Sequence, residues 1–210
     1  MSPILVLAGA AAGAAVSPLL ARAATRLTTN QASLTRRGRY LLATGTAIAG
    51  AAVTGLPTLL STVLYAMFAA AILTAAAVDA IELRIPDRIT YPTLLVGVLV
   101  LPLTTDLAPT EVLAPLAGAV VSGAWALVMA LVADQGLGDV KLAAAIGAWT
   151  AHLGVLPWIM GVLLSQIAIA GVVAAAVRRS RRGDAPRGYT ALGPALTMGA
   201  VLAVGAAALI

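Results

Sequence analysis

The 210-residue sequence has no cysteine, a single histidine and few charged residues, which make up 10% of the chain. Without cysteine there is no disulfide, no thiol nucleophile and no cysteine-ligated zinc or iron–sulfur site. The shortage of charge argues against an ordinary soluble domain, in which roughly 25% of residues are charged. The sequence therefore gives no indication of redox chemistry, and it leaves the cellular compartment open.

What the chain has in abundance is apolar side chains. Hydrophobic residues make up 61% of it and the mean hydropathy is +1.01, more apolar surface than one soluble core can hide. The lipid bilayer is therefore its solvent. Because a transmembrane helix needs roughly 20 apolar residues, a chain of this length holds at most about eight short spans.

Turn residues and polar stretches divide the chain into successive apolar runs. We expect an all-α, polytopic membrane bundle of about eight transmembrane helices, with a range of six to eight because the second and sixth runs are short. The runs cover residues 3–21, 40–55, 58–78, 89–103, 112–133, 140–156, 158–177 and 189–210. We divide the chain into residues 1–39, the first helix with a basic cytoplasmic loop, and residues 40–210, the membrane core.

The basic residues predict the topology. With an outside N-terminus, all thirteen Lys and Arg residues fall in the four loops expected inside, at 22–39, 80–88, 134–141 and 178–188. Cytoplasmic loops collect such residues, so both termini are expected outside. The arginines have no interleaved aromatic residues, and we therefore expect no nucleic-acid partner despite the net charge of +5.

Two acids lie at the expected cytoplasmic ends of apolar runs. Asp79 closes the third run, and Asp139 follows two glycines in Gly136-Leu137-Gly138-Asp139. An acid at a membrane boundary is costly enough to indicate a function. Two carboxylates close together cannot both be ionised cheaply, so one can act as an acid while the other takes a proton from water. This is the aspartic-protease arrangement, which needs neither a metal nor a cofactor.

The two motifs resemble those of the type IV prepilin peptidases. Residues 79–87 read Asp-Ala-Ile-Glu-Leu-Arg-Ile-Pro-Asp, and Gly136-Leu137-Gly138-Asp139 continues into Val140-Lys141-Leu142. In that family an acid precedes an Ile-Pro-Asp or Ile-Pro-Asn element, and the second acid ends a GxGD loop. The resemblance implies that Asp79 and Asp139 are the catalytic pair. Gly193-Pro194 is also similar to a late family element.

From the resemblance we expect an enzyme of the bacterial cytoplasmic membrane with its active site facing the cytoplasm. Its substrate would be a prepilin or pseudopilin, cut between a basic leader and a hydrophobic helix. Many members carry a cytoplasmic insert with paired cysteines, often linked with N-methylation. This chain has no cysteine, so we predict a minimal peptidase and leave methyltransferase activity open.

Six further residues are candidates for substrate approach. Five of them also have a structural explanation: the glycines as a turn, Glu82 as a solvated or paired acid, Asp87 as the N-cap of the fourth helix, and Lys141 as an interface anchor. For the glycines we favour close approach of substrate backbone, and for Asp87 the structural role. The six are Gly136, Gly138, Lys141, Glu82, Pro86 and Asp87. Asp134 is the local rival of Asp139 but lacks the glycine context.

Two other functions remain as alternatives. An intramembrane aspartic protease of the presenilin or signal-peptide-peptidase type is suggested by Pro194-Ala195-Leu196, which matches a signature of that group. A small proton-coupled transporter would use the acids as relays. Against the first, Asp79 lies at a helix boundary and is followed by Ile85-Pro86-Asp87. Against the second, the chain shows no convincing repeat.

Overall fold

The computed structural model describes residues 2–29, 32–104, 112–133, 136–181 and 190–208. These residues form helices and no strand, which confirms the all-α prediction. The helices are α1 (Pro3–Leu27), α2 (Arg36–Val53), α3 (Leu59–Glu82), α4 (Asp87–Leu95), α6 (Ala114–Ala133), α7 (Leu137–His152), α8 (Val155–Arg181) and α9 (Gly193–Ala207). A π-helical stretch, Val96–Val100, and a 3-10 turn, Leu101–Thr104, prolong α4.

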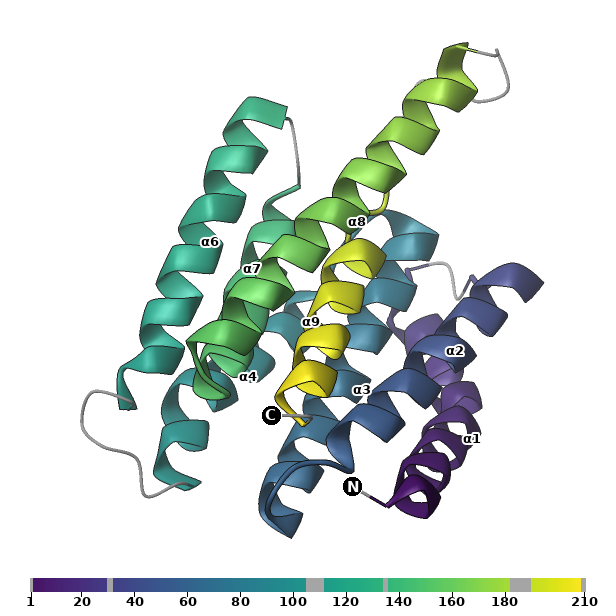
Figure 1. The fold of residues 1–210 in the computed structure, drawn as a ribbon. Coiled ribbons are helices and arrows are strands. Elements are labelled where there is room, and N and C mark those ends of the chain that lie inside the picture. The colour runs from purple at the N-terminus through teal and green to yellow at the C-terminus, as the bar shows by residue number, and fades with distance from the viewer. Residues whose placement is uncertain (1, 30–31, 105–111, 134–135, 182–189, 209–210) are drawn as a thin grey trace.

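Successive helices run antiparallel and pack in pairs (Figure 1). The pairs are α1 with α2, α6 with α7, and α8 with α9, while α3 packs against α1, α2, α4 and α9. Helix α9 also contacts α2 and α7, so it lies at the centre of the bundle. Its buried residues include Ala200 and Ala203, both fully buried. The short side chains of this Ala- and Gly-rich sequence allow the helix backbones to approach closely.

Local capping explains where several helices begin. Thr58 and Ser61 form a reciprocal capping box at the start of α3, with the Ser61 N–H donating to Thr58 Oγ1 at 3.0 Å. Thr35 accepts a hydrogen bond from the Gly38 N–H at 3.1 Å and caps α2. Pro194 occupies the first turn of α9, where its missing N–H costs nothing. Three of the described helices, α2, α3 and α9, therefore have a start that is explained by their first residues.

Four of the helices are long and apolar enough to cross a membrane: α1, α3, α6 and α8. Helix α9 is apolar but shorter, and α2 and α7 have 18 and 16 residues. The shortness expected of the second and sixth runs is thus confirmed. One expectation was wrong: α1 continues to Leu27 and α2 already begins at Arg36, so the loop predicted at 22–39 is mostly helix. Arginine is a good helix former and extends helices past the apolar segment.

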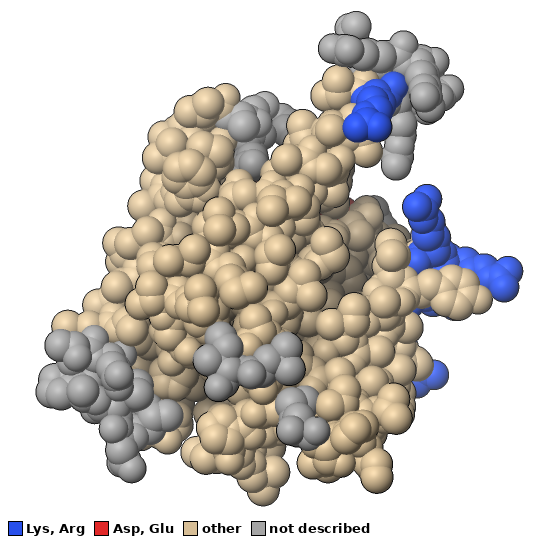
Figure 2. Space-filling view, viewed as in Figure 1, with Lys and Arg blue, Asp and Glu red and all other residues tan. Residues whose placement is uncertain are grey.

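The basic side chains gather at one end of the bundle, which we call the basic end. It is the end where α1, α3 and α8 finish and where α2, α4, α7 and α9 begin. Figure 2 shows Lys and Arg along the right-hand edge, and no Asp or Glu of the described residues is visible in this view. Positive-inside topology requires such a gathering of Lys and Arg at one membrane face. Asp106, Glu111 and Asp134 lie outside the described residues.

Candidate active site

The first acidic motif lies where α3 ends at the basic end. Leu83 caps the helix in the left-handed region, with φ at 54°, and its N–H donates to the Asp79 carbonyl at 2.8 Å. A leucine adopts this conformation only at some cost in strain. The resulting sharp turn directs Ile85 and Pro86 away from the α3 axis, and Pro86 then opens α4 as its N-cap.

Asp79 itself is buried, with 5% of its surface exposed. Its Oδ2 accepts a hydrogen bond from the backbone N–H of Gly193, the first residue of α9, at 2.9 Å. A residue 114 positions later in the chain therefore holds this carboxylate. Buried carboxylates need such partners, because an unpaired charge in an apolar interior is costly.

The second motif opens α7. Gly136 is the N-cap in an extended conformation, and Asp139 lies in the first helical turn with 9% of its surface exposed. The helix N-terminus favours a negative charge at that position. Gly138 is in contact with the first motif, because a Cβ built on it would lie 3.1 Å from the Ile85 Cβ. Its missing side chain thus lets the two motifs pack together, a structural use besides the substrate approach we expected.

Both aspartates line one cavity of about 680 Å³ at the basic end. The cavity brings together the end of α1, the turn after α3 and the starts of α4 and α7. Its lining residues are Arg26, Leu27, Thr29, Asp79, Leu83, Arg84, Ile85, Pro86, Asp87, Arg88, Gly136, Leu137, Gly138, Asp139 and Lys141. Of the eight residues selected from the sequence, seven line this cavity and Glu82 does not.

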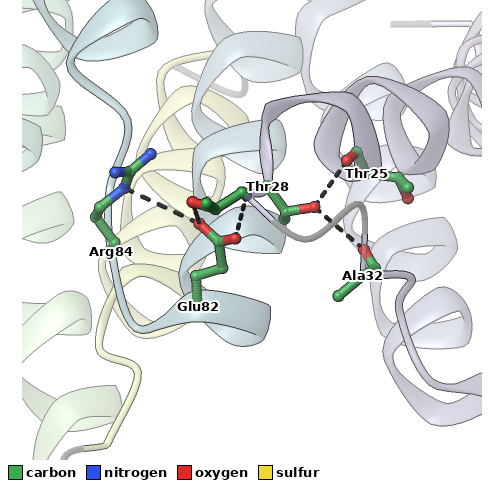
Figure 3. Close-up of polar contacts among 6 residues, drawn as sticks. Thr25, Thr28, Ala32, Glu82 and Arg84 are labelled. Atoms are coloured by element: carbon green, nitrogen blue, oxygen red, sulfur yellow. Dashed lines mark hydrogen bonds and ion pairs between the residues drawn. The ribbon is translucent and has the colours of Figure 1, made fainter.

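Glu82 instead ties the chain after α1 to the end of α3. Its carboxylate accepts hydrogen bonds from the backbone N–H of Thr29 and, at 3.4 Å, from the Thr29 hydroxyl. The Arg84 Nε lies 4.0 Å from the same carboxylate. Figure 3 shows Glu82 between Arg84 and the chain that leaves α1. This contact places Thr29 at the wall of the cavity, so Glu82 shapes the site from outside it.

Lys141 and Asp87 form an ion pair across the cavity wall. The Lys141 ammonium lies 2.7 Å from Asp87 Oδ1 and 5.0 Å from the centre of the Tyr91 ring. The expectation that Asp87 caps the fourth helix was wrong, because Pro86 is the N-cap and Asp87 the first helical residue. The carboxylate bonds to the lysine of α7 instead. The pair joins α4 to α7 just beside Asp139.

A second, smaller cavity also has Asp139 in its lining. It has a volume of about 30 Å³ and lies between α6, α7, α8 and α9, with Ala126, Ala143 and Leu196 among its mostly apolar lining. Helices α6 and α8 lean apart toward the basic end in Figure 1. Farther along, Trp158 Nε1 of α8 donates to Ser122 Oγ of α6 at 2.9 Å. Asp139 therefore lines both the large cavity, which is of mixed polarity, and a small, mostly apolar one.

The contribution of α1 to the cavity was not predicted from the sequence. Arg26, Leu27 and Thr29 line the large cavity although no motif marks them. The available signal was the positive-inside pattern, which already put the end of the first helix on the same side as both acids. Within the described residues, no three His, Cys, Asp or Glu side chains lie close enough to hold a metal ion.

Comparison with known proteins gives one positive finding. The model of the type IV leader peptidase family matches residues 66–175, a segment that includes both aspartate motifs. Neither the curated proteins nor the solved structures gave a match. The matched segment runs from α3 into α8 and ends before α9, the helix whose first N–H contacts Asp79.

Proposed function

Because the chain belongs to the type IV leader peptidase family, we propose that it is a membrane aspartic endopeptidase of prepilins or pseudopilins. It removes a basic leader at the cytoplasmic membrane face, with Asp79 and Asp139 as the catalytic pair. The observation that carries the proposal is the single cavity lined by both aspartates. Family membership supports a peptidase, and the placement of the two acids supports an aspartic mechanism.

The chemistry needs one proton shared between two carboxylates. The ionised aspartate takes a proton from water, and the resulting hydroxide adds to the carbonyl carbon of the scissile peptide. The protonated aspartate donates its proton to the carbonyl oxygen. As the tetrahedral intermediate collapses, the C–N bond breaks and the amine leaves with a proton from the first aspartate, while the second takes its proton back. No metal takes part in these steps.

Of the two cavities, the large one at the basic end has room for part of a peptide substrate, with a volume of about 680 Å³. It receives the polar leader and the scissile bond, and the hydrophobic segment of the substrate stays in the membrane. The lining has four basic residues, Arg26, Arg84, Arg88 and Lys141, and three acids. The lining itself does not attract a basic leader. The leader's charge acts instead by retaining it on the cytoplasmic side, which brings the scissile bond to this face.

The test is to incubate the purified chain, reconstituted in lipid, with a prepilin-type substrate that has a basic leader and an apolar segment. We expect a single cut at the junction of leader and apolar segment, read by intact mass, and no loss of activity with a metal chelator. A cut inside the apolar segment would instead indicate an intramembrane protease. Absence of any cut, with several substrates and correctly folded protein, would contradict the proposal.

A further inference from the structure

The first residue of α9 lies directly against one of the two proposed catalytic groups. The Gly193 N–H donates to Asp79 Oδ2 at 2.9 Å, and this contact is buried. Figure 1 shows α9 beginning beside the end of α3, at the basic end. The donor belongs to the first turn of a 15-residue helix. The dipole of that helix places a partial positive charge at its N-terminus. A backbone N–H can only donate, so the bond favours the ionised form of the carboxylate.

A side chain at position 193 would disturb the same contact. A Cβ at this residue would lie 2.9 Å from Asp79 Oδ2 and 3.2 Å from its Cβ, closer than real Cβ atoms usually come. Any side chain would push the carboxylate away from the N–H. The helix is not free to yield, because α9 is buried among α2, α3, α7 and α8. Ser165 of α8 also bonds to it, donating to the Leu196 carbonyl at 3.2 Å.

From this geometry we infer that Gly193 is a positioning residue that fixes Asp79 as the ionised aspartate. Asp79 is then the base that takes the proton from water, and Asp139 is the acid that donates to the carbonyl oxygen. The inference rests on the aspartate-pair peptidase proposed above. Asp139 also lies in a helix first turn, so a helix dipole alone does not separate the two acids. The Asp139 carboxylate also lies near a backbone group, that of Gly136 at the start of its own helix. What distinguishes Asp79 is a buried bond from the first N–H of a different helix.

Other charges face Asp79 in the cavity and form a background common to every variant compared. They are Asp139 and Lys141 on α7, Asp87 and Arg88 on α4, Arg26 on α1 and Arg84 after α3. Lys141 and Asp87 already neutralise each other as a pair. None of these groups changes when Gly193 is replaced. A change in the pH profile of the variant therefore reports on the Gly193 contact.

The test compares Gly193→Ala with Gly205→Ala on the same helix. A Cβ at Gly205 meets only the Ala52 Cβ, at an ordinary 3.5 Å, so this control should behave as wild type. For Gly193→Ala we expect kcat to fall about ten- to a hundredfold, since a hydrogen bond to a charged group is lost. We also expect the acidic limb of the rate–pH profile to move up by about one pH unit, with KM little changed.

Which limb of the rate–pH profile moves decides whether Asp79 is the base or the proton donor. If Asp79 is the ionised base, weakening its bond makes it take up a proton at higher pH, and the acidic limb shifts. If Asp79 were the proton donor, the alkaline limb would shift instead and the roles would be reversed. A variant with wild-type rate and both limbs unchanged would contradict any role for Gly193.

A second variant covers the case in which Gly193→Ala does not fold. Pro194 is exposed and preorganises the first turn of α9, so Pro194→Ala should fold and loosen the same contact. We expect the same limb to move, by less. An inactive wild type would mean that the proposed function fails. An active wild type with neither variant shifted would mean that this inference alone fails.

Discussion

Replacing either Asp79 or Asp139 with Asn should lower the rate of leader removal by about 10²- to 10⁴-fold, the usual range for loss of a positioned acid or base. Each amide keeps the size of the carboxylate, but it cannot take a proton from water or supply one to a carbonyl oxygen. Both side chains are nearly buried and line the same cavity. The measurement is the initial rate of product formation by mass spectrometry, at equal amounts of folded protein.

Asp87→Asn is the matched control for this prediction. Asp87 is a carboxylate in the same cavity, but it is engaged by Lys141 and its side chain is 56% exposed. Exposed ion pairs contribute about 1 kcal/mol or less, so we expect a rate within about tenfold of wild type. Normal cleavage by the Asp79 or Asp139 variant would eliminate the proposed catalytic pair. An equally severe loss in the control would show that any carboxylate in the cavity is required.

Trp149→Ala should be the most destabilising single substitution in the bundle, at about 3–5 kcal/mol. The indole is 2% exposed, stacks on Phe68 at 4.7 Å and meets Tyr65 edge-on at 5.2 Å. Its Nε1 donates to the Thr93 carbonyl at 2.8 Å, next to the π-helical stretch that prolongs α4. Truncation leaves a cavity and removes the indole donor from the Thr93 carbonyl, which keeps the backbone N–H of Val96. Thermal unfolding in detergent measures the loss.

The same aromatic cluster ties the two aspartate helices to each other. Tyr65 on α3 donates its hydroxyl to the Trp149 carbonyl on α7 at 2.8 Å. Trp149→Phe keeps an aromatic ring but loses the bond to Thr93, so its stability should fall between wild type and the alanine variant. Trp125→Ala is the control, because that indole is 46% exposed and its loss should cost less than about 1 kcal/mol. Equal destabilisation at positions 125 and 149 would refute the account.

Much of the architecture follows from patterns within single segments. Apolar runs bounded by polar turns predicted the helices, and α6 begins and ends within two residues of its expected run. Asp79 and Asp139 were selected because each is an acid at a membrane boundary next to a recognisable element. Asp79 precedes an Ile-Pro-Asp element, and Asp139 follows two glycines. The positive-inside pattern placed both acids on one side, and the structure brings them to one cavity.

What the sequence could not predict depends on contacts between distant segments. The role of Glu82 comes from the chain after α1, 53 residues earlier, and that of Asp87 from a lysine 54 residues later. The bond from Gly193 to Asp79 spans 114 residues. No pattern within a single segment indicates contacts between residues so far apart in the sequence. Gly193 stood out only through its resemblance to a family element, which gave no physical role.

The most direct test of the central claim, that Asp79 and Asp139 form one site in a shared cavity, uses the absence of native cysteine. In the double variant Asp79→Cys/Asp139→Cys, a short bifunctional thiol reagent should link α3 to α7 within the membrane-embedded protein. The control is Asp79→Cys/His152→Cys, since His152 lies at the opposite end of α7. Cross-linking of the first pair and not the second, seen by mass spectrometry after proteolysis between the helices, is the predicted result. Failure of the 79/139 pair to link, or equal linking of both pairs, would contradict a shared site.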